Sequence, residues 1–405
     1  MLYNAVVGQS GGPTSAINAT LRGVIDGAFR YRDEGRLGTL YGMKNGIEGF
    51  LREDLVDLLH VFRNKDDLDT LELTPAAALG SCRRKLKSYD EDAETYVKIL
   101  EILKKYNIRY FFYIGGNDSM DTVLKLSEYA KACEYELYVI GVPKTVDNDL
   151  CHTDHTPGFG SAAKYIATTI KEIKRDVSVY KIPAVTIVEI MGRDAGWLTA
   201  AASLPSLSGD APDLIYLPER AFSMDLFLDD VKAALANHPD VLVAVSEGIR
   251  SADGEYIGAS ATAVDAFGHK QLSGAGRVLE AFLKAEIGCK VRSIELNLPQ
   301  RCAAHLASLT DIRESARIGS AAFDSAIACE SGVMMTFVRK NNPYSVEIFS
   351  VSIKDVANEV RSVPDAYIND KGNGITEEGI DYLRPLILGE PAPIYVDGMP
   401  KHIKI

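Results

Sequence analysis

A lysine and two aspartates within six residues form the densest group of reactive side chains in this sequence. Lys144, Asp147 and Asp149 follow the apolar run 137–142 and Pro143. Alternate residues of an extended segment face the same side, so the two carboxylates are expected to share one face. One carboxylate can then coordinate Mg²⁺ while the other accepts a proton. A polar loop is the alternative interpretation, but Asp-Asn-Asp directly behind Lys-Thr is dense for a connector.

A glycine turn at residues 8–15 offers a place for an anion. The sequence Gly-Gln-Ser-Gly-Gly-Pro-Thr-Ser follows the first apolar run. Gly11 and Gly12 allow backbone N–H groups to approach a phosphate, and Ser15 can cap a helix whose N-terminus favours negative charge. Because many glycine turns after strands are only turns, this motif alone is weak support for a phosphate site.

A second glycine turn, Gly-Gly-Asn-Asp-Ser at residues 115–119, carries two polar oxygen ligands. Asn117 and Asp118 come directly after the apolar run 110–114. Such oxygens suit a metal-bound phosphate group, although a capped helix start is the simpler interpretation. The common nucleotide-binding loops GxxxxGK[ST] and GxGxxG do not occur in the sequence, so phosphate would be bound without them.

Arginines at the ends of further apolar runs favour a phosphorylated substrate. Arginine binds phosphate through two parallel hydrogen bonds, and an acidic protein needs local cations to hold such a group. For any single arginine a surface salt bridge is the better interpretation, but several near strand ends together indicate a site. The residues concerned are Met191, Gly192 and Arg193, then Glu247, and finally Arg292 and Arg301.

The elements that would position these residues alternate between strands and helices. Short runs rich in valine, isoleucine and tyrosine are typical of parallel strands buried on both faces. Helical patterns follow the two glycine turns, near 15–27 and from about residue 120. This alternation predicts an α/β fold with parallel sheets. The expected strands are 5–7, 110–114, 137–142, 184–190 and 241–246, and 334–338 with 345–351 is expected to form a hairpin.

The composition narrows the class of protein. With 405 residues, 46% of them hydrophobic, the chain can form two or three domains with cores. A net charge of -12 argues against binding to nucleic acid or to an anionic membrane. Apolar runs stay well short of the roughly 20 residues of a membrane helix, and the N-terminus does not resemble a secretion signal. Six scattered cysteines are typical of reduced thiols in a cytoplasmic protein.

In this order, the motifs resemble those of the phosphofructokinase family, from Val6 to about Arg301. Thr-Val-Asp-Asn-Asp (145–149) together with Met-Gly-Arg (191–193) is the most specific part of the match. The resemblance implies Mg²⁺-dependent transfer of a phosphoryl group to the 1-hydroxyl of fructose 6-phosphate. Further matching pieces are Ser-Gly-Gly (10–12), Gly-Ser-Cys-Arg (80–83), Gly-Gly-Asn-Asp-Ser (115–119), Glu-Gly (247–248) and Gln-Arg (300–301).

The resemblance also implies a role for each residue. Asp147 would be the general base for the sugar hydroxyl, and Asn117 and Asp149 would lie at the Mg²⁺. Phosphoryl transfer depends on positioning and charge stabilisation, and the catalytic group would comprise Asp147, Asp118, Lys144 and Arg193. The residues expected to bind the sugar phosphate are Thr145, Val146, Asp147, Met191, Gly192, Arg193, Glu247, Arg292 and Arg301, and those expected to bind the donor are Gly11, Gly12, Arg83, Asp118 and Lys144.

The fold implied by the resemblance has two Rossmann-like domains with mainly parallel sheets and a C-terminal extension. A donor-binding domain is expected over 1–145 with part of 250–300. A sugar-phosphate domain is expected over 146–250 with part of 300–330, and the extension over 333–405. Because subunits share active sites in this family, a homodimer or homotetramer is implied, with Arg292 acting across the interface.

The donor is predicted from Asp118 and Lys144. ATP-dependent members resemble Gly-Gly-Asp-Gly-Ser and Pro-Gly-Thr at these places, whereas pyrophosphate-dependent members carry Asp and Lys instead of the two variable glycines. A carboxylate at 118 would lie about where the α-phosphate of ATP must go. Two like charges about 4 Å apart repel by about 4 kcal/mol at an effective dielectric constant of about 20. Lys144 would compensate Asp118 and bind pyrophosphate, which favours pyrophosphate as the donor.

Three positions depart from the family pattern. Asn117 stands where many members have a Mg²⁺-associated aspartate, and an amide oxygen binds the metal with less charge. Lys181 takes the place of an arginine that reaches the neighbouring subunit in many members. Leu298-Pro299 departs from the histidine or tyrosine that many members have before Gln-Arg, so the contact with the sugar 6-phosphate is expected to differ.

Other interpretations remain open in the sequence. Cys-His-Thr-Asp-His at 151–155 is rich in metal ligands, but their spacing is too close for a structural zinc site, and we interpret it as an active-site loop. An ATP-dependent enzyme and a non-catalytic regulatory subunit that binds sugar phosphate are the alternative functions. Retention of Asp147 argues against the regulatory subunit, because binding alone needs no base. A NAD-kinase-like enzyme does not fit the segment 144–149.

Overall fold

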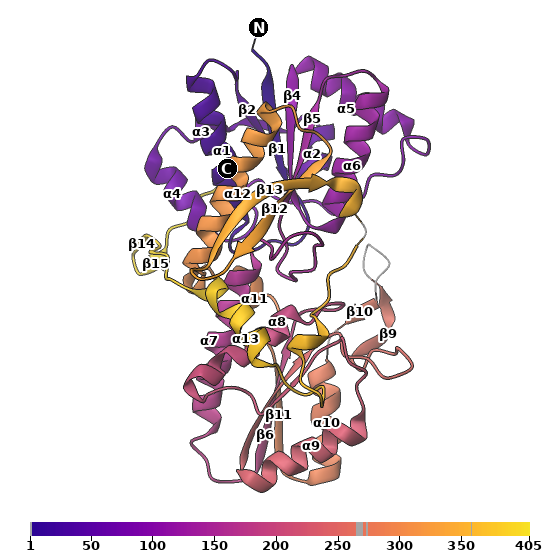
Figure 1. Ribbon diagram of the computed structural model, residues 1–405, viewed down its shortest axis with the longest axis vertical. Coiled ribbons are helices and arrows are strands. Elements are labelled where there is room, and N and C mark those ends of the chain that lie inside the picture. Colours follow the sequence, from indigo (N-terminus) through magenta and orange to yellow (C-terminus); the bar gives the residue numbers. More distant parts are fainter. Residues whose placement is uncertain (1, 265–269, 273, 358) are drawn as a thin grey trace.

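The upper lobe in Figure 1 is built on a seven-stranded sheet with the order β13-β12-β5-β4-β1-β2-β3. The computed structural model describes residues 2–264, 270–272, 274–357 and 359–405. The four inner strand pairs are parallel, and the two outermost pairs are antiparallel. The strands are β1 (Asn4–Gln9), β2 (Leu40–Met43), β3 (Leu55–Asp57), β4 (Ile108–Gly115), β5 (Tyr138–Pro143), β12 (Val333–Lys340) and β13 (Ser345–Ser352).

Helices cover both faces of this sheet because its strands direct apolar side chains to either side. Phe112 packs with helices α1 and α12, whereas its neighbour Phe111 packs with α5 and α6. The helices of this lobe are α1 (Ile17–Asp33), α2 (Gly46–Leu51), α3 (Leu58–Val61), α4 (Lys65–Leu73), α5 (Ala93–Lys105), α6 (Asn117–Ala132) and α12 (Leu309–Ile327).

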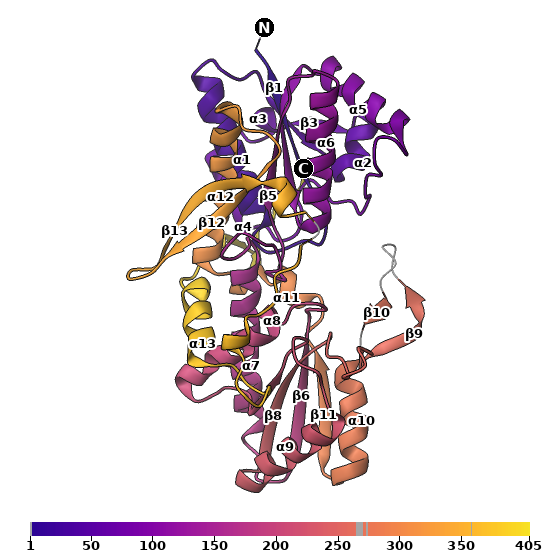
Figure 2. The ribbon, with the colours of Figure 1, turned by 45° about the vertical axis from the view of Figure 1, so that its right-hand side comes forward.

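The lower lobe repeats this layout with a four-stranded, all-parallel sheet of order β11-β6-β8-β7. Leu242 packs toward α7 and α8, and Val243 toward α9 and α10. A ribbon of β9 (Ala259–Val264) and β10 (Lys270–Leu272) stands beside this lobe (Figure 2). The other elements are β6 (Ala184–Ile190), β7 (Leu214–Tyr216), β8 (Asp240–Ser246), β11 (Lys290–Glu295), α7 (Phe159–Val177), α8 (Trp197–Ala200), α9 (Met224–Asn237), α10 (Ala275–Ile287) and α11 (Pro299–Cys302).

The C-terminal segment runs from the lower lobe back to the upper one (Figure 1). Helix α13 (Glu377–Leu383) contributes Ile380, Tyr382 and Leu383 to the core around α7. Further on, Ile403 packs with the core of the upper lobe and donates its N–H to Thr74 Oγ1 at 3.1 Å. The short elements of the chain are η1 (Ala201–Ser208), η2 (Ala304–Leu306), η3 (Ile353–Asp355), η4 (Asp365–Tyr367), η5 (Arg384–Ile387), β14 (Tyr395–Val396) and β15 (Met399–Pro400).

The structure confirms the α/β class, the five parallel strands and the hairpin β12–β13. Helix α6 starts three residues earlier than predicted, directly at Asn117. The six cysteines are free. In the described part of the chain, no helix combines the length and apolar character needed to cross a membrane.

Three segments belong to different lobes than the sequence analysis assigned. Within 250–300, β11 and α10 belong to the lower lobe and not to the donor-binding domain. β11 pairs with β6 along its length, and α10 packs on these two strands. Within 300–330, α12 packs against α1 of the upper lobe. The first part of the expected extension, 333–352, forms β12 and β13 of the upper sheet, so the extension is limited to the chain beyond residue 352.

Candidate active site

The carboxyl ends of the parallel strands in the two lobes meet at the junction between them (Figure 1). After β1 the chain turns at Gly11, which has a positive φ of 76°. A side chain there would come within 3.3 Å of Lys144 Nζ, and one at Gly12 within 3.3 Å of Arg301 Nη1. Glycines at both positions therefore leave room for two cations, one from each lobe.

Lys144 lies at the start of residues 144–158, which connect β5 to α7 and are here called the catalytic segment. Its side chain is only 2% exposed, and Nζ donates a hydrogen bond to the Gly12 carbonyl at 2.6 Å. Burial lowers the pKa of Lys144 to about 8, against the opposing effect of the Asp147 and Asp149 charges. A buried ammonium group is stabilised by nearby negative charge, which Asp147 and Asp149 supply in part and a bound phosphate group would increase.

Asp147 and Asp149 share the junction with this lysine. Desolvation, followed by the negative charges of Asp149 and Glu247, raises the pKa of Asp147 to about 7. Burial also raises the pKa of Asp149. The backbone N–H of Asp147 donates to Thr145 Oγ1 at 3.1 Å, which stabilises the turn. A carboxylate with a pKa near neutrality is suited to accept a proton from a bound hydroxyl.

The lower lobe adds a basic and an acidic side chain after β6 and β8. Gly192, with φ 128°, donates its N–H to Glu247 Oε1 at 3.2 Å. The Met191 N–H donates to Gln300 Oε1 at 3.2 Å. Next to them, Arg193 Nε is buried with no hydrogen-bond partner among the described residues. A buried guanidinium nitrogen without a partner costs free energy unless a ligand supplies an acceptor.

A second buried atom with no hydrogen-bond partner in the described part of the chain is the side-chain oxygen of Asn117, at the start of α6. With the Asp149 carboxylate it offers oxygen ligands of the kind Mg²⁺ prefers. Within the described residues no group of three or more His, Cys, Asp or Glu side chains is placed to hold a metal. This donor set fits Mg²⁺, which usually binds one or two protein oxygens together with water and substrate phosphates.

Asp118 lies at the exposed edge of the site and differs from the expected arrangement. We expected Lys144 to compensate its charge. Instead, Asp118 pairs with Lys85 at 3.2 Å, and both side chains are about half exposed, at 55% and 50%. Lys144 is turned away to Gly12 because the buried ammonium requires a close acceptor. Arg83 is also exposed on this edge.

Two predicted residues stand apart from this group. Arg292 is exposed near the start of β11, where it lies in register with Thr186, and it lines a small cavity with Tyr180 and Ile182. Within one chain it therefore lies toward the other end of the sheet from Met191. The side chain of Val146 is 8% exposed and packs in the lower core.

Sequence reasoning missed Lys85 and Ser246. Lys85 ends the basic run Arg-Arg-Lys at 83–85, which is a usable signal next to the glycine turn. Ser246, the last residue of β8, accepts the Gly248 N–H at 3.1 Å and donates to the Gly192 carbonyl. No sequence motif distinguishes this serine, because its role depends on two turns that meet only in the fold.

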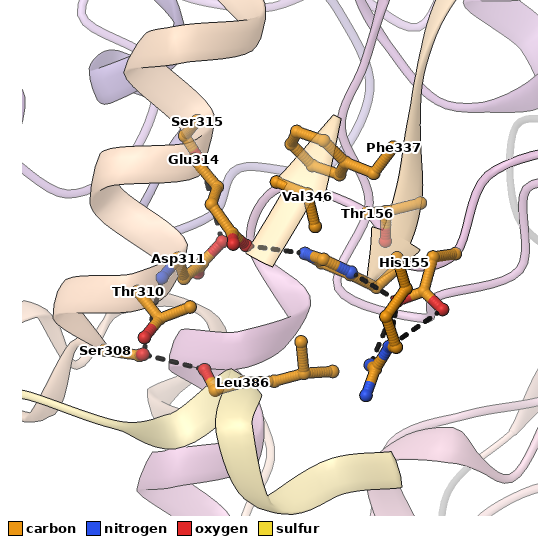
Figure 3. Close-up of polar contacts among 12 residues, drawn as sticks. His155, Thr156, Ser308, Thr310, Asp311, Glu314, Ser315, Phe337, Val346 and Leu386 are labelled. Atoms are coloured by element: carbon orange, nitrogen blue, oxygen red, sulfur yellow. Dashed lines mark hydrogen bonds and ion pairs between the residues drawn. The ribbon is translucent and has the colours of Figure 1, made fainter. Parts of the chain in front are cut away.

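The histidine of the ligand-rich stretch 151–155 that is buried, His155, already has a partner at each ring nitrogen. Figure 3 shows the ring of His155 directed at Glu314 of α12. Its two nitrogens lie 2.8 Å from Asp154 Oδ1 and 2.8 Å from Glu314 Oε2. Burial alone would lower the pKa of His155, but the hydrogen bonds to these two carboxylates raise it to about 9. The His155 ring thus ties the catalytic segment to α12, and both of its nitrogens are engaged by carboxylates, which leaves neither for zinc.

Comparisons with known proteins identify the family to which the chain belongs. The family described as "Phosphofructokinase" matches residues 4–325. The chain is 41% identical to the pyrophosphate–fructose 6-phosphate 1-phosphotransferase of Methylococcus capsulatus, covering 99% of this chain and 96% of that protein. It is 42% identical to the enzyme of the same name from Xanthomonas campestris pv. campestris, covering 99% and 96%.

A solved structure gives the same result. The crystal structure of pyrophosphate-dependent phosphofructokinase from Nitrosospira multiformis superposes with a TM-score of 0.90 at 37% identity, covering 100% of this chain and 96% of that one. The match extends over both lobes and the C-terminal segment. This chain belongs to the phosphofructokinase family.

Proposed function

We propose that this chain transfers a phosphoryl group reversibly from pyrophosphate to the 1-hydroxyl of fructose 6-phosphate, giving fructose 1,6-bisphosphate and phosphate, a step of glycolysis. The observation that carries the proposal is the group of buried Lys144, Asp147 and half-buried Arg301, whose charges interact at the junction of the lobes. Full-length relatives that are named for this reaction support the choice of substrates. The six free cysteine thiols of this chain are typical of a reducing compartment, which favours the cytoplasm as its location.

The two lobes divide the substrates between them. The upper lobe would bind pyrophosphate through Gly11, Gly12 and Lys144, and the lower lobe would bind the sugar phosphate through Arg193 and Glu247. The sugar 1-oxygen attacks the terminal phosphorus, the bond to the bridging oxygen breaks, and inorganic phosphate leaves. Asp147 takes the hydroxyl proton. Lys144 and Arg193 stabilise the charge on the phosphoryl group in flight.

We also infer that the cofactor is Mg²⁺, held by Asn117 and Asp149 together with the pyrophosphate oxygens. When bound, it would neutralise phosphate charge. The support is the side-chain oxygen of Asn117, which is buried and has no hydrogen-bond partner among the residues that the structure describes. Asn117 contributes no formal charge, so Asp149 would carry most of the electrostatic attraction for the ion.

A homodimer or homotetramer with shared sites remains part of the proposal. Arg292 is exposed and lies away from the carboxyl ends of the strands in its own chain. Tyr180 and Ile182 beside it are 64% and 56% exposed. Exposed apolar side chains beside an exposed arginine suit contact with a second copy that places Arg292 in the neighbouring site.

The donor assay tests the function directly. Purified protein is given fructose 6-phosphate and Mg²⁺ with pyrophosphate or ATP in parallel. We expect turnover with pyrophosphate and little with ATP, because Asp118 repels the α-phosphate. Turnover with ATP alone would make this an ATP-dependent enzyme. Inactivity with every donor would favour the regulatory subunit.

Two variants of Asp118 separate charge from shape. Asp118→Asn removes the charge at nearly constant size, and Asp118→Gly removes both. If repulsion excludes ATP, Asp118→Asn should already raise ATP turnover, up to about 10³-fold for about 4 kcal/mol. If only Asp118→Gly raises it, steric exclusion dominates. Neither variant should lower the melting temperature appreciably, because an exposed ion pair and an acidic side chain in the first turn of a helix each contribute little to stability.

A further inference from the structure

The turn between the two catalytic carboxylates depends on one buried side chain. Asn148 lies between Asp147 and Asp149 with a positive φ of 54°, a conformation that asparagine tolerates better than most residues. Its side chain is fully buried, and its Oδ1 accepts the Thr156 N–H at 3.0 Å. The directions of the two flanking carboxylates therefore follow from where the Asn148 amide is held.

The other end of this amide is held by the C-terminal segment. Asn148 Nδ2 donates to the hydroxyl of Tyr382 at 3.1 Å, and that hydroxyl donates to the Asp154 carbonyl at 2.6 Å. Tyr382 belongs to α13, and it is 7% exposed. Its ring packs against Trp197 with centroids 5.2 Å apart, so its position is fixed by the lower core.

Other contacts hold the same segment in place. The Arg361 N–H donates to the Asp149 carbonyl at 2.8 Å, and its Nη1 donates to the Asp154 carbonyl. Arg339 of β12 donates through Nε to Asp154 Oδ1 at 3.0 Å and lies over the Tyr382 ring. The ion pair of His155 with Glu314 in Figure 3 closes this network on the side of α12.

We propose that Tyr382 is a positioning residue for phosphoryl transfer, whose hydroxyl orients Asn148 and through it the carboxylates of Asp147 and Asp149. The inference rests on the proposed function and adds to it a role for a residue that lies outside both sheets. Tyr382 itself contacts no reacting atom. It acts because its hydroxyl contacts the catalytic segment at Asn148 and at the Asp154 carbonyl, and it also accepts longer hydrogen bonds from the Arg361 guanidinium at 3.4 and 3.5 Å.

Substitution by phenylalanine isolates this hydroxyl. Tyr382→Phe keeps the ring packing against Trp197 but leaves the buried Nδ2 of Asn148 without the Tyr382 acceptor. If the amide shifts to find a partner, the turn shifts with it. We expect kcat to fall about 10- to 100-fold, the range expected when a buried polar group loses its partner at a place that controls the transition state.

The matched control is Tyr344→Phe. The Tyr344 hydroxyl lies 3.0 and 3.2 Å from the two oxygens of Glu314, in the same polar network but one step further from the turn. Its loss should leave kcat within about twofold of the parent, since the acceptor retains His155. Urea unfolding and circular dichroism of both variants establish the folded fraction.

The experiment measures kcat and KM for fructose 6-phosphate, with pyrophosphate and with ATP. Support requires a fall in kcat for Tyr382→Phe but not for Tyr344→Phe. In both variants KM for fructose 6-phosphate should be nearly unchanged and the protein fully folded. Parent-like kcat, or equal losses in the two variants, would overturn the positioning role while leaving the proposed function intact. A parent inactive with both donors would contradict the proposed function, and the positioning role would fall with it.

Discussion

The exposed donor edge and the buried catalytic segment belong to one site but follow different physical rules. At the donor edge, formed by Arg83, Lys85 and Asp118, the charged groups are open to water, and the ion pair there has two half-exposed partners. In the catalytic segment, burial shifts the pKa of Lys144 down and that of Asp147 up. Charge is therefore inexpensive to change at the edge and costly to change inside.

This difference separates donor choice from acceptor chemistry. A charge at position 118 can alter which phosphate compound fits without altering the fold, because solvent screens most of its interactions. In the catalytic segment each charge contributes to the pKa of its neighbours, so a single substitution changes the whole group. Variants in the two regions should accordingly differ by orders of magnitude in their effects.

The largest effect is expected from Asp147→Asn. Without a proton acceptor, turnover should fall by about 10²- to 10⁴-fold. Binding of fructose 6-phosphate, measured by calorimetry, should remain, because an amide keeps the size of the side chain. Turnover within a few-fold of the parent would mean that another group takes the proton.

An intermediate effect is expected from His155→Gln, for which the free energy of unfolding is measured as a function of pH. The folded pKa of His155, about 9, exceeds the ordinary value of 6.5, so the imidazolium stabilises the fold fully below about pH 6.5. This contribution, on the order of 3 kcal/mol, is lost as the pH rises through about 9. In urea unfolding, the parent's advantage over the variant should shrink between pH 6.5 and 9.5.

Comparison with the variant cancels other groups that titrate in this range, such as Lys144. A difference in unfolding free energy that is constant with pH would show that the ring is neutral in the folded protein. The contacts with Asp154 and Glu314 would then involve a neutral imidazole instead of an ion pair.

The smallest effect is expected from Lys85→Ala at the donor edge. Loss of its pair with Asp118 should change the free energy of unfolding by less than about 1 kcal/mol, because exposed ion pairs contribute little. The ratio of ATP to pyrophosphate turnover should stay within about threefold, since Asp118 keeps its charge. A larger change in either measurement would place Lys85 among the residues that bind the donor.

The sequence predicted the strands and the α/β class because buried parallel strands leave continuous apolar runs. It did not predict that α12 packs on α1, because the apolar stripe of an amphipathic helix does not indicate which sheet it covers. For the same reason the sequence does not show that 333–352 belongs to the upper sheet and not to an extension. Its hairpin was evident, but its partner β5 lies far away along the chain.

For the site, motif reasoning grouped Lys144, Asp147 and Asp149, which are close in sequence and lie close in space. It failed for the partner of Lys144, because the choice between Asp118 and the Gly12 carbonyl depends on burial. It also gave Tyr382 no role. Tyrosines in a C-terminal helix are common, and the hydrogen bond to Asn148 spans more than two hundred residues.

The crossing of the chain between lobes has a consequence for biosynthesis. The four strands of the lower sheet come from one continuous stretch, from β6 to β11, whereas the upper sheet needs β12 to cover the edge of β5. During synthesis the strands of the lower sheet can pair as soon as β11 has emerged, although the core around α7 is completed only by α13. The upper lobe must wait, with the apolar strand β5 unpaired on one side, until about residue 340 leaves the ribosome. Chains that stall before that point would expose an unpaired strand edge that is prone to aggregation, and we expect them to depend on chaperones.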